Sequence, residues 1–271
     1  MYQLFEKYIT NFPIGKSNFL WIYPGILIYG TIINTLVFSP DSLDKQKNTH
    51  YLLEPGNIIN KIFAYNGNKV FLTLFLSIMF IKIWYRKTKQ LLYCLPTANN
   101  VSLEDYNSNE KADILRIIKE YLIKLLLKYF VLYILFFIID HVFILTGGTC
   151  SVGNGSVKDA LECKDTYGGE WRGGFDISGH FCFLTNLSLI FWFEIRDFSQ
   201  ILQENWKPWL ILKCLIISVL SVWIVILSIT AIYYHTLWEK ILGVLFGYGC
   251  PTVMYLLVPK YNKKIGSFLY E

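Results

Sequence analysis

Charged residues are scarce in this sequence. Asp, Glu, Lys and Arg make up 17% of its 271 residues, while apolar residues make up 54%. Soluble domains usually carry about 25% charged residues and about 45–50% apolar residues. The charge that is present gathers in short polar stretches between long apolar blocks. This distribution excludes a soluble globular fold and predicts an integral membrane protein.

Features that identify several other classes of protein are also missing. The net charge is only +5, and no compact Lys/Arg run is interleaved with aromatic residues, so we expect no nucleic-acid partner. The six cysteines and four histidines show no close metal-ligand spacing, so we expect no metal and no cofactor. No window resembles a cleavable signal peptide, because the first apolar block has the length of a membrane span.

Six apolar blocks have the length of membrane-crossing helices. A helix needs about 20 apolar residues to cross roughly 30 Å of hydrocarbon. Lipid cannot satisfy free backbone polar groups, so each span must be helical. We therefore expect an all-α bundle of six transmembrane helices, forming one domain over residues 1–271. The predicted spans are residues 19–38, 62–84, 129–145, 177–193, 210–234 and 241–258.

Lys and Arg are distributed unequally on the two sides of these spans. The amino terminus, the connections 85–128 and 194–209, and the tail hold 15 of them, against 8 on the opposite side. Because positive residues concentrate on the cytoplasmic side, both termini are predicted to face the cytosol. The basic stretch 110–128 has two interpretations, a segment along the cytosolic leaflet or a charged extension of the third span.

The connection 146–175 is then predicted to lie outside the cytosol. It contains Cys150, Cys163 and a sequon that begins at Asn154. Disulfides persist in oxidising compartments, and glycans are added to such sequons in secreted and lumenal segments. A Cys150–Cys163 disulfide is our candidate here, and the alternative is two free thiols and an unused sequon.

Two of the histidines lie at span ends. His180 is found where the fourth span begins, and His235 where the fifth span ends. One span leaves a membrane face and the next returns to it, so both imidazoles are expected at the same face. Ionisable groups at membrane depth are costly and usually functional. A histidine pair suits phosphoryl transfer through a phosphohistidine, with one ring as nucleophile and the other as general acid.

Each of these histidines has an acidic residue four positions away. Asp176 precedes His180, and Glu239 follows His235. At that spacing two side chains share a helix face, where a carboxylate orients the ring and holds its proton on one nitrogen. Two alternatives stay open: interfacial histidines that only cap helices or reach the headgroups, and a metal site formed by the two histidines with an acid.

The residues around both histidines resemble the two signature stretches of the fat storage-inducing transmembrane (FIT) family. They are Phe175-Asp176-Ile177-Ser178-Gly179-His180-Phe181 and Tyr234-His235-Thr236-Leu237-Trp238-Glu239-Lys240-Ile241-Leu242-Gly243. The hydrophobic layout resembles this family from the first span to the last, as in a compact fungal-type member. The resemblance implies a six-span endoplasmic reticulum protein with cytosolic termini and a lumenal active site.

The same resemblance implies an activity. It would be a diphosphatase that hydrolyses fatty acyl-CoA to acyl 4′-phosphopantetheine and adenosine 3′,5′-bisphosphate, in support of lipid droplet formation and phospholipid homeostasis. Apolar residues of the fourth span and its surroundings are expected to contact the acyl chain, or else to face neighbouring helices. They are Phe181, Phe183, Leu184 and Trp238.

The FIT family is itself similar to the lipid phosphate phosphatases. Their Pro-Ser-Gly-His motif is matched by Ser178, Gly179 and His180, with Ile177 in place of Pro. By this resemblance His180 is the acid that protonates the leaving group. The Lys and Arg-Pro pattern of their first motif is not found.

Their third motif is matched in part. Ser228 and His235 have its spacing, but Glu239 replaces an Asp and Ile229 stands where an Arg is expected. The resemblance makes His235 the nucleophile. The charge on pentavalent phosphorus must be compensated, and without that Arg the compensating residues are open. The candidates are Lys61, Lys69, Arg172 and Lys240.

A function of another class also fits the sequence. The aromatic-rich spans permit a non-catalytic protein that binds diacylglycerol or triacylglycerol and partitions it in the bilayer. A transporter fits less well, because the spans lack paired Gly/Pro-broken helices in matching halves.

Overall fold

The structure is a computed structural model that describes residues 17–39, 42, 45–46, 49–54, 56–94, 103–152, 157, 163, 166–201 and 206–258. Asn154 lies outside these residues. So do the amino terminus and the tail, which carry part of the predicted charge asymmetry.

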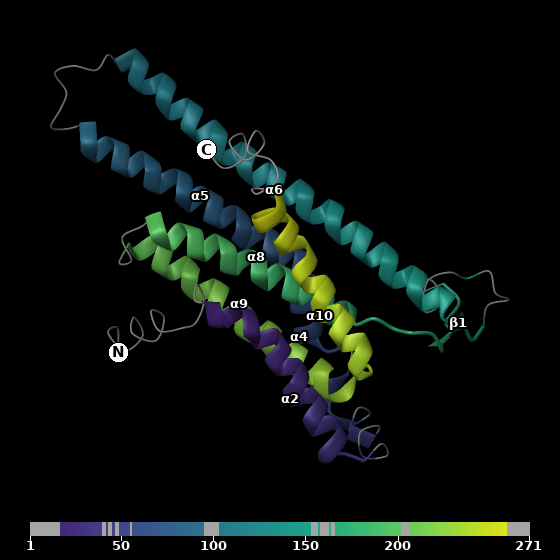
Figure 1. Ribbon diagram of the computed structural model, residues 1–271. Coiled ribbons are helices and arrows are strands. Elements are labelled where there is room, and N and C mark those ends of the chain that lie inside the picture. Colours follow the sequence, from purple (N-terminus) through teal and green to yellow (C-terminus); the bar gives the residue numbers. More distant parts are fainter. Residues whose placement is uncertain are drawn as a thin grey trace.

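The described residues form a bundle of long helices with one small hairpin (Figure 1). The long helices are α2 (Ile22–Leu36), α5 (Gly67–Cys94), α6 (Leu103–Leu145), α8 (Gly179–Ile201), α9 (Lys207–Tyr233) and α10 (Leu237–Thr252). Shorter helical segments are η1 (Ser17–Trp21), η2 (Tyr51–Leu53), α4 (Ile58–Asn60), the π-helical η3 (Lys61–Tyr65) and η4 (Val253–Leu257). The strands β1 (Thr149–Cys150) and β2 (Trp171–Arg172) are antiparallel.

Five helical segments of the described chain are long and apolar enough to cross a membrane. They are Ser17–Leu36, Tyr51–Thr88, Lys111–Leu145, Lys207–Tyr233 and Leu237–Leu257. The all-α multi-pass architecture is therefore confirmed. The fourth predicted span, residues 177–193, falls mostly in α8, which is not among the five, so the count of six is not confirmed.

The burial of α8 explains why its composition differs from that of the other helices. From Phe181 to Ile195 nearly all of its side chains are buried inside the bundle. A helix surrounded by protein has no need for a fully apolar surface. Accordingly α8 carries Asn186 and Glu194, which are 0% and 2% exposed.

Glycines allow α10 to approach α8 closely. A Cβ added to Gly243 would lie 2.6 Å from the carbonyl oxygen of Ser178, and one added to Gly247 would lie 2.7 Å from Cβ of Thr185. Small residues four positions apart commonly permit such close helix contacts in membranes. The contact fixes the start of α8 against the first turns of α10.

The hydrophilic half of α6 is helical like the rest. This helix has 43 residues and is therefore about 65 Å long, roughly twice the hydrocarbon thickness. Figure 1 shows α5 and α6 side by side and extending past the other helices. Residues 110–128 thus form an extension of the third span rather than a separate surface segment.

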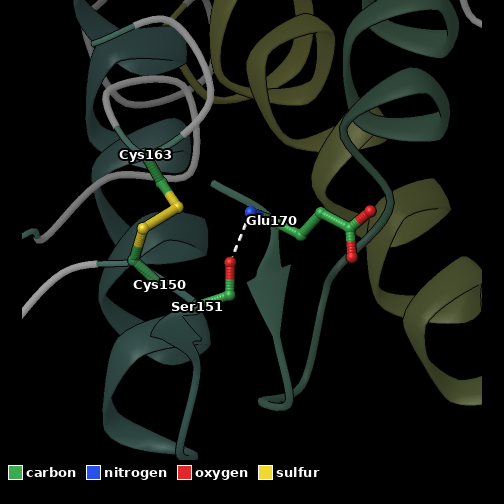
Figure 2. Close-up of a disulfide and its surroundings, with 4 residues drawn as sticks. All are labelled: Cys150, Ser151, Cys163 and Glu170. Atoms are coloured by element: carbon green, nitrogen blue, oxygen red, sulfur yellow. Dashed lines mark hydrogen bonds between the residues drawn. A yellow bond between two sulfur atoms is a disulfide. The ribbon is translucent and has the colours of Figure 1, made fainter. Parts of the chain in front are cut away.

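A disulfide and a short hairpin lead the chain into the histidine region. Cys150 is bonded to Cys163, with 5.7 Å between their Cα atoms (Figure 2). Two hydrogen bonds of 2.8 Å join Ser151 and Glu170. Ser151 N donates to the Glu170 carbonyl oxygen, and Glu170 N donates to Oγ of Ser151. The next hydrogen bond runs from Phe175 N to Oγ1 of Thr146 at 2.6 Å. These contacts hold the loop before α8 at the end of α6.

Candidate active site

His180 and His235 line the same cavity, which has a volume of about 300 Å³. One wall is the last part of α9, from Val225 to Thr230, and the opposite wall is formed by η2 and α4. Asp176 also lines it. The parity of the spans predicts both imidazoles at one membrane face, and in the structure both line one pocket.

His235 lies in the short connection between α9 and α10. Its φ of +59° is in the left-handed region, which is uncommon for a residue other than glycine and is often found at functional sites. The neighbours on both sides are held in place. The Tyr234 hydroxyl donates to the Leu53 carbonyl oxygen, and Thr236 caps α10. The backbone therefore projects His235 from a constrained turn.

His180 is the second residue of α8. Ser178 starts this helix, since its carbonyl oxygen accepts from Cys182 N at 3.0 Å and its side-chain oxygen accepts from Phe181 N at 3.5 Å. Ser178 itself is fully buried. His180 also borders a second cavity of about 350 Å³, which Gly179 lines as well.

The acidic partner of His235 is Asp176. Oδ2 of Asp176 lies 3.4 Å from Nδ1 of His235, whereas Oε2 of Glu239 lies 3.9 Å away. The predicted pairing of Asp176 with His180 assumed a shared helix face, but α8 begins at Gly179, so Asp176 precedes the helix. The connection that contains Asp176 instead crosses to the turn that carries His235.

Burial raises the pKa of the Asp176 carboxyl above its ordinary value. The positive charge of protonated His235 acts in the opposite direction, and the Glu239 carboxylate raises this pKa further. Asp176 therefore keeps its proton to a higher pH than an exposed aspartate does. Its ionised form is stabilised mainly by His235.

Glu239 has a different position from the one expected. Its Oε1 accepts from Asp176 N at 2.9 Å, and its Oε2 accepts from Thr236 N at 2.6 Å. Its backbone carbonyl oxygen accepts from Ser178 N at 3.2 Å. The second of these bonds belongs to a capping box at the start of α10. Glu239 thus connects the two segments that carry the histidines.

None of the four cationic candidates for phosphate binding lines this cavity. Lys61 is exposed on η3, and Lys69 borders another cavity, between α5 and α9. Arg172 pairs with Glu170 on the surface, with 3.0 Å between Nη2 and Oε2. Lys240 is 2% exposed, and its Nζ donates to the Ala231 carbonyl oxygen at 2.6 Å.

The remaining supporting residue, Ser228, also stays outside the cavity lining. Its hydroxyl donates to the Ile224 carbonyl oxygen at 2.8 Å, within its own helix. In the part of the chain that is described, no group of three or more His, Cys, Asp or Glu side chains is placed to hold a metal ion.

Sequence reasoning missed the polar wall opposite α9. Asn57 and Asn60 line the cavity. Oδ1 of Asn57 accepts from Asn60 N at 2.8 Å, and Nδ2 of Asn57 donates to the carbonyl oxygens of Leu52 and Glu54. The available signal was a pair of asparagines directly before a predicted span, but polar residues at a span end are too common to select these two.

Comparison with known proteins agrees with the sequence motifs. The chain is 41% identical to acyl-coenzyme A diphosphatase YFT2 of Saccharomyces cerevisiae over 253 residues, which is 88% of this chain and 91% of the relative. It is 37% identical to acyl-coenzyme A diphosphatase fit1 of Schizosaccharomyces pombe over 41% of this chain and 44% of the relative.

A vertebrate relative also matches. Acyl-coenzyme A diphosphatase FITM2 of Xenopus laevis is 28% identical over 64% of this chain and 65% of its own length. No solved structure matches the chain. The fat storage-inducing transmembrane protein family matches residues 48–209 and 198–255, which together include both histidine segments. With most of its length covered by this match, the chain belongs to the FIT family of membrane proteins.

Proposed function

We propose that this protein is an acyl-CoA diphosphatase. It hydrolyses the phosphoanhydride of fatty acyl-CoA to acyl 4′-phosphopantetheine and adenosine 3′,5′-bisphosphate. The names of its relatives support this activity. The observation that carries the proposal is that His180 and His235 line one cavity together with Asp176, because phosphoryl transfer through histidine needs a nucleophile and a proton donor around one phosphate.

His235 is the proposed nucleophile. A carboxylate beside Nδ1 favours the tautomer that carries its proton there, which leaves the lone pair on Nε2 free to attack phosphorus. Asp176 is in this position. In the first step a bond forms between Nε2 and phosphorus while the anhydride P–O bond breaks.

His180 is the proposed acid and base. In the first step it gives a proton to the oxygen of the leaving phosphate. In the second step it takes a proton from a water molecule that attacks the phosphohistidine, which releases the second product and restores both rings. His180 needs no direct bond to His235 for this exchange, only access to the same phosphate.

Glu239 is proposed as a positioning residue. Both of its carboxylate oxygens accept from backbone N–H groups on the two histidine segments. In this role it sets the separation of the two rings and takes no proton during turnover.

The proposed location is the endoplasmic reticulum membrane, with six spans, cytosolic termini and the site on the lumenal side. The Lys/Arg asymmetry supports this orientation. The disulfide supports it as well, since Cys150 and Cys163 belong to the connection that would be lumenal.

The activity is tested with purified protein and a long-chain acyl-CoA. Mass spectrometry should find acyl 4′-phosphopantetheine and adenosine 3′,5′-bisphosphate with the wild type. His235→Ala should form neither, and His180→Ala should show no turnover, releasing at most one equivalent of the leaving product per protein. His141→Ala is the matched control, because His141 is exposed and contacts the Phe137 carbonyl oxygen outside the cavity.

Two results would reject the proposal. Cleavage at the thioester would show a different class of reaction. Unchanged product release by His235→Ala would show that His235 is not the nucleophile. The alternative of neutral-lipid binding would be favoured by two results together. The wild type would be inactive, and it would retain labelled diacylglycerol or triacylglycerol to the same extent as the double-histidine variant.

A further inference from the structure

The cavity of the two histidines changes character along its length. At the end beside the turn of His235 it is lined by ionisable side chains, those of Glu54, Asp176, His180 and His235. At the other end its wall on α9 is aliphatic and includes Val225, Ile226 and Ile229, with Ile59 of α4 opposite. An amphiphile fits such a site in only one direction, with its charged part beside the histidines.

We infer that this aliphatic end, defined by Ile59, Val225, Ile226 and Ile229, is the acyl-chain subsite. The inference rests on the proposed acyl-CoA diphosphatase activity and adds the path of the lipid arm. The phosphoanhydride lies at the histidine end, and the acyl-pantetheine arm runs along α9 toward the bilayer interior.

The depth of the cavity agrees with this path. Val225 lies eight positions before Tyr233, the last residue of α9, and a helix rises about 1.5 Å per residue, so the wall descends about 12 Å, roughly two-fifths of a 30 Å hydrocarbon core. Val225 is also 55% exposed on the outer surface of the bundle. The deep end therefore opens toward lipid, and a chain longer than the cavity continues into the membrane.

Ile229 gives this wall its aliphatic character close to the chemistry. It lies six residues before His235, where the sequence pattern matched by Ser228 and His235 has an arginine. A guanidinium at this position would make the wall polar. The isoleucine makes the same surface suitable for alkyl carbons.

The second cavity is a weaker candidate for the chain. It is lined by Ala64, Tyr65, Phe136 and Phe183 besides Gly179 and His180, and neither His235 nor Asp176 lines it. A chain bound there would draw the phosphoanhydride to the side of His180 that lacks the nucleophile.

Residues that the sequence suggested as chain contacts lie elsewhere. Phe181 and Leu184 are 0% exposed in the bundle core, and Trp238 is 67% exposed. None of the three lines either cavity. Phe183, which lines the second cavity, is the one exception among the four.

The test compares short-, medium- and long-chain acyl-CoAs as substrates of purified variants. In Val225→Trp the indole obstructs the deep end, so kcat/KM for long chains should fall about tenfold or more, with little change for short chains. Ile211→Trp is the control, because Ile211 is a 63% exposed aliphatic residue on the same helix and lines neither cavity.

A second variant keeps the test independent of how well an added tryptophan is tolerated. Ile229→Ala enlarges the aliphatic end, so methyl-branched acyl chains should become relatively better substrates than straight chains. For comparison, Ala64→Phe narrows the second cavity and should leave chain-length preference unchanged.

The outcomes separate the inference from the proposed function. If the wild type cleaves acyl-CoA but Val225→Trp and Ile229→Ala keep its chain preference, the subsite is wrong and the activity stands. A shift of preference in Ala64→Phe would place the chain in the second cavity and overturn the inference. A wild type that cleaves no phosphoanhydride would reject the function itself.

Discussion

Two carboxylates lie near His235, and their contacts assign them different tasks. Oδ2 of Asp176 lies 3.4 Å from Nδ1 of His235, and the Asp176 side chain is half exposed. Asp176 can therefore change its protonation with the charge of the His235 ring. Glu239 is nearly buried, and backbone donors occupy both of its oxygens. A substitution of Asp176 should therefore show its effect in activity, and a substitution of Glu239 in stability.

Replacement of Asp176 should affect the chemistry more than the fold. Asp176→Asn removes the group that favours the attacking tautomer, so kcat should fall about a hundredfold with KM little changed. Because the raised pKa belongs to a group that works when ionised, wild-type activity should fall as pH drops through that pKa. The variant should lose this acidic limb of the pH–rate profile. An unchanged kcat and pH profile would exclude the role.

Replacement of Glu239 should affect the fold. Glu239→Gln leaves one acceptor oxygen where two are used and places an amide donor against a backbone N–H. The expected loss is about 1–3 kcal/mol of unfolding free energy, because a buried backbone donor is left unsatisfied. Thermal unfolding in detergent measures it. A variant that unfolds like the wild type while losing activity would make Glu239 a participant in the chemistry instead.

The sequence was informative about which residues meet and less so about how they pair. Parity of the spans was enough to place His180 and His235 at one face. The pairing of acids with histidines was not accessible, because it depended on α8 beginning at Gly179 rather than before Asp176. Helix ends depend on tertiary contacts such as the hydrogen bond from Ser178 N to the Glu239 carbonyl oxygen. These two residues lie far apart in sequence, so local patterns do not predict their contact.

At the scale of elements, the contact of α8 with α10 supports the site. α10 begins directly after the turn that carries His235, and α8 begins directly before His180. Any displacement between these two helices therefore changes the separation of the two rings. The close approach at Gly243 and Gly247 makes this displacement costly.

A single methyl group at this contact should reduce both stability and activity. In Gly243→Ala the new Cβ would lie 2.6 Å from a backbone oxygen, which cannot move aside as a flexible side chain can. We expect a loss of about 1–3 kcal/mol in stability, with reduced kcat, measured by thermal unfolding and product release.

The control for this variant is Gly249→Ala in the same helix. There the nearest atom to the added Cβ is Cδ1 of Leu135 at 3.7 Å, an ordinary van der Waals distance. A loss in Gly249→Ala as large as that in Gly243→Ala would show that the contact with α8 is not its cause, since Ala by itself favours a helix over Gly.

At the scale of the whole molecule, α8 is the helix that sequence analysis described least well. Hydropathy does not distinguish burial in lipid from burial in protein. A helix enclosed by other helices can carry polar residues that pair with its neighbours, and these residues lower its hydropathy. Glu194 is an example. Its two oxygens accept from Lys124 Nζ and the Tyr121 hydroxyl, both at 2.6 Å. Such pairing explains why α8 tolerates a carboxylate that a lipid-facing helix would not.

The bundle separates these two polar regions along α8. The histidine cavity lies at its first turn, and the Glu194 contacts lie fifteen residues later, about 22 Å along the axis. The ion pair with Lys124 joins α8 to α6 at that end. The ion pair of Glu194 and the histidine cavity therefore lie at opposite ends of α8.

A phosphorylated histidine is the species that the account requires. His180→Ala keeps the proposed nucleophile but lacks the acid for forming its phosphoryl adduct and the base for hydrolysing it. The adduct should therefore form slowly and persist, so prolonged incubation with long-chain acyl-CoA followed by rapid quenching should trap it. Peptide mass spectrometry at neutral to alkaline pH should then find the phosphoryl group on His235. Turnover by the wild type, with no phosphohistidine on that peptide in either protein or with the group on another residue, would contradict the account.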